Sequence, residues 1–147
     1  MKYRLLQAKV IDPSSTWNGQ ILDLDIENGQ WKKAAGEVLA NTQVIDLNGK
    51  VIMPGFCELY AYTGDPGHEY REDIISVTKA AAAGGFTAIC SIPDAEPVTQ
   101  HKTQVEYVLR KGSTTPAQVW PLGAITENLQ GKNPTEMYDM HYAGAVA

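Results

Sequence analysis

From Pro54 onward, short apolar runs alternate with longer stretches of helical periodicity, and this alternation limits what the chain can fold into. A strand–helix–strand rhythm is typical of a parallel sheet whose strands are joined by crossover helices. The sequence therefore predicts an α/β fold for this part of the chain. We expect strands at residues 51–61, 86–92 and 117–124, a fourth strand starting at 145, and helices at about 73–83, 99–112 and 133–143.

Residues at the expected helix ends support these boundaries. Glu72 and Asp73 place negative charge at the positive end of the first helix, and Gly84-Gly85 is a typical stop signal. Thr99 is the expected cap of the second helix, which ends at Gly112. Asn133-Pro134 supplies a cap residue followed by a proline suited to the first helical position, so the third helix is expected to begin there and to stop before Gly144.

The first 52 residues have a different pattern. Ile21-Leu22-Asp23-Leu24-Asp25-Ile26 alternates apolar and polar side chains with period two, which indicates a half-buried strand. The pairs Asn28-Gly29 and Asn48-Gly49 are strong signals of tight turns between short strands. We therefore expect a small β module at residues 1–52 and an α/β module at residues 53–147.

The length of the chain constrains the size of this α/β module. A complete (β/α) barrel has eight strand–helix units and needs ~250 residues, whereas this chain has 147. About half of a barrel fits, and an open half barrel exposes a strand edge and apolar surface. We expect either a fragment of a longer protein or a chain that forms an oligomer or needs another partner.

Composition excludes several classes of function. The net charge of −5 and the absence of a basic stripe argue against a nucleic-acid partner. No apolar run approaches the ~20 residues that a membrane span needs, and the N-terminal run is too short for a signal peptide, so a cytoplasmic location without membrane contact is expected. Cys57 and Cys90 lie singly in apolar runs and are expected to be buried free thiols.

The most informative motif is Pro54-Gly55-Phe56-Cys57-Glu58-Leu59-Tyr60-Ala61-Tyr62-Thr63-Gly64-Asp65-Pro66-Gly67. It resembles the opening of the cyclic amidohydrolases, and of dihydroorotases in particular, where a Pro-Gly-hydrophobic run leads into Asp-x-His-x-His-x-Arg-x-Pro-Gly. Glu58, Tyr60, Tyr62 and Gly64 stand at the positions of Asp, His, His and Arg.

Other segments are similar to the same family. Asp94 stands in Ser91-Ile92-Pro93-Asp94-Ala95-Glu96-Pro97, where dihydroorotases carry Met-Pro-Asn-Thr-x-Pro with an Asn that helps to hold the substrate carboxylate. The resemblance implies the N-terminal portion of an amidohydrolase-type TIM (β/α)8 barrel, about half of it, preceded by a small β-sandwich segment. The remaining similar segments are 69–87, 121–132 and 143–147.

The resemblance also implies a zinc-dependent hydrolase site, and this sequence departs from it. Tyr60 and Tyr62 would converge from one strand face, but a neutral phenol with a pKa near ~10 is a poor zinc ligand. Gly64 removes a cationic partner for the substrate carboxylate, and Asp94 brings like charge toward it. Without zinc the family has no hydroxide nucleophile at neutral pH, so we expect no metal and no catalytic residue at these degenerate positions.

Three functional hypotheses follow from the resemblance. The first is a non-catalytic dihydroorotase homologue in pyrimidine biosynthesis that supports aspartate transcarbamoylase as a structural subunit. The second is an active, divergent dihydroorotase or another cyclic amidohydrolase that holds metal through later residues. The third is a small-molecule-binding pseudoenzyme, to which Tyr60, Tyr62 and Asp94 would offer hydroxyls and a carboxylate. His68, on the loop after the first barrel strand, is a possible ligand contact.

Overall fold

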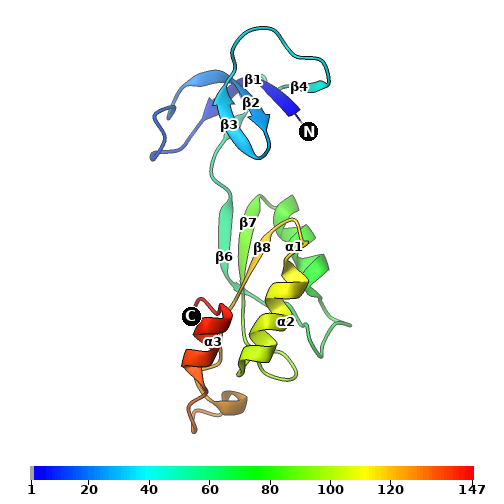
Figure 1. Ribbon diagram of the computed structural model, residues 1–147, viewed down its shortest axis with the longest axis vertical. Coiled ribbons are helices and arrows are strands. Elements are labelled where there is room, and N and C mark those ends of the chain that lie inside the picture. Colours follow the sequence, from blue (N-terminus) through cyan, green and yellow to red (C-terminus); the bar gives the residue numbers. More distant parts are fainter. Residues whose placement is uncertain (1) are drawn as a thin grey trace. The chain divides into compact units, whose positions relative to one another are not determined.

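The computed structural model describes residues 2–147 (Figure 1). The chain forms two compact units, and the boundary in the sequence falls between Pro54 and Gly55. The first unit contains only strands, whereas the second contains parallel strands joined by helices. No helix within residues 2–147 is both long enough and apolar enough to cross a membrane.

The first unit is a five-stranded sheet. Four of its strands have the order β3-β2-β1-β4, and the fifth strand, β5, pairs with β1. The strand β1 is antiparallel to β2 and parallel to both β4 and β5, and β2 and β3 form an antiparallel hairpin. The strands are β1 (Lys2–Val10), β2 (Ile21–Glu27), β3 (Gln30–Lys33), β4 (Thr42–Asp46) and β5 (Val51–Ile52).

The expected tight turn at Asn28-Gly29 connects β2 and β3. Asn28 and Gly29 both have positive φ angles, of 52° and 75°, which is the conformation of the tight hairpin turn that Asn-Gly favours. Inside the sheet, Arg4 donates to both carboxylate oxygens of Asp25 at 2.7 and 2.9 Å. The apolar side chains of one face pack together around Leu5, Ala8, Val10 and Leu24.

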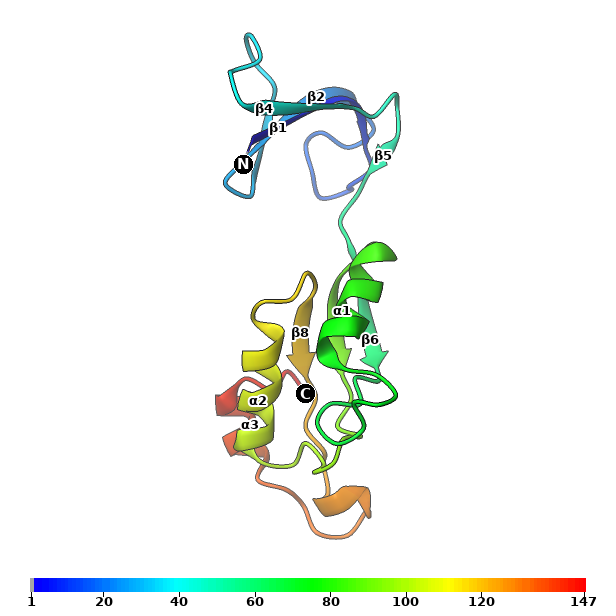
Figure 2. The same cartoon turned by 90° about the vertical axis from the view of Figure 1, so that its right-hand side faces the viewer.

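The second unit is a three-stranded parallel sheet with the order β6-β7-β8. Figure 2 shows α1 and α2 side by side against one face of this sheet. The elements are β6 (Phe56–Ala61), α1 (Ile74–Ala83), β7 (Phe86–Ser91), α2 (Lys102–Gly112), β8 (Gln118–Pro121), the 3-10 turn η1 (Glu127–Leu129) and α3 (Met137–Ala143). The α/β pattern expected after Pro54 is therefore confirmed.

The face covered by helices forms the main core of this unit. Ala61, Ile89 and Val119 project from the three strands and pack against Ile74 of α1 and Val108 of α2. Close packing of α2 on the sheet also needs Gly112, because a Cβ there would lie 2.8 Å from the Val119 side chain. The helix α1 begins with Asp73 as its cap, and the Asp73 carboxylate accepts a hydrogen bond from Ser76 N at 2.8 Å.

The opposite face of the sheet is open. It forms an apolar groove of about 550 Å³. Leu59, which lines this groove, is 69% exposed. Cys57 is also exposed and only Cys90 is buried, so the expectation of two buried thiols is wrong for Cys57. The groove is lined by Leu59, Cys90, Trp120, Leu122, Val146 and Ala147.

Two expectations about element boundaries are wrong, one for the strand at residues 51–61 and one for the cap of the second helix. Residues 51–61 form two strands in place of one, since β5 pairs with β1 whereas β6 pairs with β7, and residues 53–55 separate them. The cap of α2 is His101 and not Thr99. Thr99 is buried, and its carbonyl accepts a hydrogen bond from Ala124 N at 2.8 Å, so it joins two loops.

The third helix starts later than Asn133-Pro134 suggests. The Asn133 carbonyl accepts from Glu127 N at 2.9 Å, and Pro134 forms an isolated bridge with Thr126, so this segment is extended. The helix α3 begins only at Met137. Residues 145–147 are not a strand, although Val146 N donates to the Pro121 carbonyl at 3.1 Å beside the end of β8.

We predict that replacing Ile89 with Ala lowers the free energy of unfolding of the second unit by about 2–5 kcal/mol, because it leaves a cavity between the sheet and both helices. Ile89 is 1% exposed, whereas Ile125 is 72% exposed and provides the matched control. Urea unfolding followed by circular dichroism measures both variants. Equal losses for Ile89→Ala and Ile125→Ala would contradict this assignment of the core.

Candidate functional site

The candidate site lies at the carboxyl ends of β6, β7 and β8, because parallel strands bring these ends to one edge of the sheet. At this edge, a hydrogen bond between two buried hydroxyls connects the ends of β6 and β7. Thr63, just after β6, and Ser91, at the end of β7, lie with their hydroxyl oxygens 2.9 Å apart. The segments that follow these two strands therefore start from a fixed, shared point.

A bulge in β6 contains Tyr60, the first of the two tyrosines of the motif. Glu58 lies opposite Ile89 and Ala61 lies opposite Ser91, so β6 has one more residue than β7 over this interval. Tyr60 falls inside the bulge and is 76% exposed, and its backbone N donates to the Glu58 carboxylate at 2.9 Å. Alternation along the strand is broken there, which places Tyr60 in solvent.

Tyr62 has a different environment from Tyr60. It is half-buried, and its hydroxyl is enclosed by protein without a hydrogen-bond partner among residues 2–147. The guanidinium of Arg71 lies over its ring, 5.2 Å from the centroid, in a cation–π contact. One ring is therefore mostly in solvent and the other is covered, and the expected convergence of the two phenols stays a prediction.

Gly64 occupies a position where a side chain does not fit. It is buried and has a φ of +61°, and a Cβ there would lie 2.6 Å from the carbonyl oxygen of Glu72 and 3.0 Å from that of His68. L-residues rarely adopt this φ, and the atoms in the way belong to the backbone. An arginine cannot be accommodated at this position by the loop as it is folded.

The other residues singled out from the sequence lie around this loop. Glu58 is half-buried and is bound to the Tyr60 backbone, while Asp94 is exposed on the loop after β7. His68 closes a turn, since its N donates to the Gly64 carbonyl at 2.7 Å. Its ring meets Tyr70 edge-on at a centroid distance of 6.1 Å, and its role as a ligand contact stays a prediction.

The strongest polar contacts of the site centre on Asp65, which is 1% exposed. Its Oδ1 accepts a hydrogen bond from the Tyr107 hydroxyl at 2.7 Å, and its Oδ2 lies 2.5 Å from Nζ of Lys111. Oδ2 also accepts from Ile74 N at 3.3 Å, at the start of α1. Lys111 donates to the Tyr107 hydroxyl at 3.2 Å, which closes the cluster.

The same contacts shift two pKa values in the cluster. Burial, and then the hydrogen bond to Asp65, raise the pKa of the Tyr107 hydroxyl. Burial alone would lower the pKa of Lys111, but its contacts with Asp65 and Tyr107 outweigh this effect and leave that pKa raised. Both side chains therefore keep their protons at neutral pH and can act as donors to the buried carboxylate.

Neither this cluster nor the Thr63–Ser91 hydrogen bond was predicted from the sequence. Asp65 stands in the turn motif Asp65-Pro66-Gly67, and an acid in such a turn is normally solvated. One available signal was the spacing of Tyr107 and Lys111, which are four residues apart and so lie on one side of a helix, next to the apolar position Val108. That spacing indicates two donors on the buried side of α2 but does not identify their acceptor.

The residues at this edge do not fit a zinc site. Zinc needs about four nitrogen, sulfur or carboxylate ligands that converge on one point. Tyr60 is turned to solvent, the Tyr62 hydroxyl is enclosed, and the Asp65 carboxylate is already bound to three donors. Among residues 2–147, no group of three or more His, Cys, Asp or Glu side chains is arranged to hold a metal ion.

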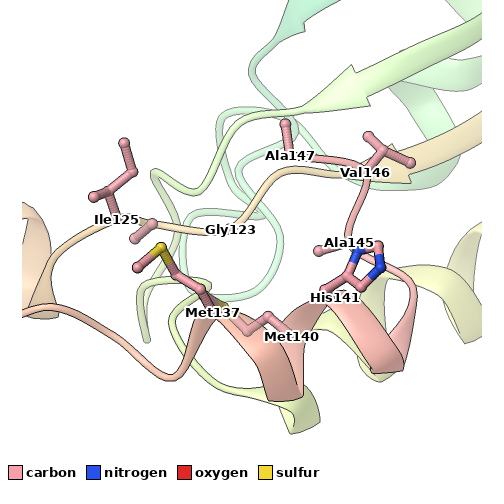
Figure 3. A pocket seen from close by; sticks show the side chains of 9 residues that line it. Gly123, Ile125, Met137, Met140, His141, Ala145, Val146 and Ala147 are labelled. Carbon is pink, nitrogen blue, oxygen red and sulfur yellow. The ribbon is translucent and has the colours of Figure 1, made fainter.

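A separate cavity of about 210 Å³ lies next to α3 (Figure 3). Figure 3 shows Met137 and Met140 of α3 facing the segment that contains Gly123 and Ile125. Its lining is mainly aliphatic and thioether, with the His141 imidazole at one side. Such a lining suits an apolar group and offers no carboxylate for acid–base chemistry.

Comparison with known proteins identifies the family. The model of the family described as dihydro-orotase-like matches residues 49–147. The chain belongs to the dihydroorotase-like family. Three curated proteins named dihydroorotase are similar to it, from Geobacter metallireducens (39% identical over 95% of this chain), Syntrophus aciditrophicus (38% over 100%) and Aquifex aeolicus (38% over 100%). The motif resemblance is confirmed, and the chain spans 34–35% of the length of these relatives.

Two solved structures share the fold of this dihydroorotase-like chain. An L-hydantoinase (dihydropyrimidinase) from Arthrobacter aurescens aligns with 98% of this chain and 31% of its own, with a TM-score of 0.74 and 22% identity. A Xaa-Pro dipeptidase with methionine in its active site aligns with 100% of this chain and 41% of its own, with a TM-score of 0.55 and 18% identity. At these identities the likeness concerns the fold alone.

We predict that Gly64→Ala lowers the free energy of unfolding by about 1–3 kcal/mol more than Gly131→Ala. Both glycines have positive φ angles, of +61° and +69°, so both variants carry similar left-handed strain. A Cβ at Gly64 meets backbone, whereas a Cβ at Gly131 meets nothing within 4 Å. Chemical unfolding of the two variants measures the difference, and equal losses would show that the loop can open around residue 64.

Proposed function

We propose that this chain is a non-catalytic dihydroorotase homologue of pyrimidine biosynthesis, located in the cytoplasm, that supports aspartate transcarbamoylase as a structural subunit. One observation carries the proposal: the end of β6 and the loop after it offer no group of metal ligands among residues 2–147 and no space for an arginine at residue 64. Tyr60 is in solvent, Tyr62 is covered by Arg71, and Gly64 is closed in by backbone.

The chemistry of ring opening supports the absence of activity. The family makes its nucleophile from zinc-bound water, whose pKa falls from ~15.7 to ~7. Phenols do not replace imidazoles as zinc ligands at neutral pH, since their own pKa lies near ~10. We therefore propose that no zinc is held between Tyr60 and Tyr62, and that none of the degenerate positions is catalytic.

The architecture supports a structural role. We infer that residues 53–147 are the first part of an amidohydrolase-type (β/α)8 barrel, about half of it, and that residues 1–52 are a segment of the adjoining β-sandwich. The parallel order β6-β7-β8 and the TM-score of 0.74 with the hydantoinase support this inference. The open apolar groove along Leu59 and Trp120 is consistent with a face that further barrel strands or another chain would cover.

A metal and activity assay of the intact purified protein tests the loss of catalysis. We expect less than about 0.1 zinc ion per chain by elemental analysis, and no turnover of dihydroorotate above the uncatalysed rate. The matched variant is Tyr60→His/Tyr62→His, which returns two imidazoles but leaves the bulge and Gly64 in place. We expect it to bind no stoichiometric zinc, because the two imidazoles supply only two of the about four ligands that zinc needs and no group of three or more His, Cys, Asp or Glu side chains lies ready among residues 2–147.

Stoichiometric zinc with turnover in the unmodified protein would overturn the proposal and would favour an active, divergent cyclic amidohydrolase. Co-elution with aspartate transcarbamoylase on a sizing column tests the partner separately. We expect one complex of both proteins, and separate elution of the two at micromolar concentration would contradict the scaffold role while leaving the loss of catalysis intact.

A further inference from the structure

We propose that Asp65, Tyr107 and Lys111 form a latch that fixes the loop after β6 to helix α2 and keeps this loop ordered without a bound metal ion. The loop consists of residues 62–72 and contains Gly64 and His68. The inference goes beyond the scaffold role, since the latch depends only on side chains of this chain.

The latch has the geometry of a fully compensated buried charge. Both oxygens of the Asp65 carboxylate are used, Oδ1 by the Tyr107 hydroxyl at 2.7 Å and Oδ2 by Lys111 at 2.5 Å. The Asp65 side chain has no exposed surface, so water cannot replace a lost partner without movement of the loop. A buried charge without its partner is strongly unfavourable, which ties the position of Asp65 to α2.

The latch extends to the neighbouring loop. Pro66, the residue after Asp65, accepts a hydrogen bond at its carbonyl from Glu96 N at 2.9 Å. Gly67 then packs directly on Glu96, because a Cβ there would lie 2.4 Å from the Glu96 carbonyl oxygen. Fixing Asp65 to α2 therefore also holds the segment after β7, which includes Asp94.

Apart from the buried Thr63–Ser91 hydroxyl pair at its start, the remaining contacts of the loop are weaker. The turn bonds from His68 N to Gly64 and from Arg71 N to His68 are ordinary backbone hydrogen bonds near the surface. The Arg71 contact with the Tyr62 ring is a partly solvated cation–π interaction. Local contacts of this kind open more readily than buried ones, so loss of the latch should release the loop before it unfolds the unit.

Hydrogen–deuterium exchange of the intact protein, read peptide by peptide at one pH, tests the latch. In Lys111→Met, which leaves the Asp65 charge without its cation, we expect exchange of residues 62–72 to rise at least about tenfold. Tyr107→Phe removes one hydroxyl and keeps the ring, so we expect a rise of several-fold at the same peptides. The control Lys102→Met removes an exposed lysine of the same helix and should change nothing.

The double variant Asp65→Asn/Lys111→Met distinguishes charge compensation from packing. It removes both charges together, so exchange of residues 62–72 should return part of the way toward that of the unmodified protein. Addition of a chelator to the unmodified protein should leave the exchange of these residues unchanged.

Three results would overturn the latch: unchanged exchange at residues 62–72 in Tyr107→Phe and Lys111→Met, a uniform rise over the whole second unit, or opening of the loop by the chelator. If Lys111→Met does not fold, Tyr107→Phe alone decides, because its smaller loss leaves the unit folded. Failure to bind aspartate transcarbamoylase would not alter any of these readings, so the two proposals fail separately.

Discussion

The buried carboxylate of Asp65 ties the end of the sheet to two helices. A charge with no exposed surface must keep its partners, and these come from α1 and from two turns of α2. Its contacts hold the chain after β6, where Gly64 adopts a left-handed conformation against the Glu72 carbonyl. The degenerate motif and the loop that carries it are thus held by hydrogen bonds and one ion pair.

This arrangement connects the sequence changes of the motif to one physical outcome. Replacing imidazoles by phenols removes zinc ligands, and Tyr60 lies in a bulge of β6 with its side chain exposed. A loop that has side-chain anchors of its own does not need a metal ion for its order. On our proposal, the protein keeps the frame of a hydrolase and offers a surface to a partner.

The parts of the fold that follow from local patterns were predictable. Period-two alternation and Asn-Gly turns indicated the N-terminal sheet, and the helix stop at Gly84-Gly85 and the strand at 86–92 agree with α1 and β7. Features set by distant contacts were not predictable. The bulge at Tyr60 depends on register with β7, and the burial of Asp65 depends on Tyr107, which lies 42 residues away. Asn133 failed as a helix cap because its carbonyl is bound to Glu127.

We propose that the carboxyl end of β6 holds no metal ion and is ordered by the Asp65 cluster. Anomalous X-ray diffraction at the zinc absorption edge, from crystals grown with an excess of zinc, tests it most directly. We expect no anomalous peak at bonding distance, about 2.0–2.3 Å, from the side chains of Tyr60, Tyr62 or Asp65. A fully occupied peak at that distance, with Asp65 turned away from Lys111, would contradict the account.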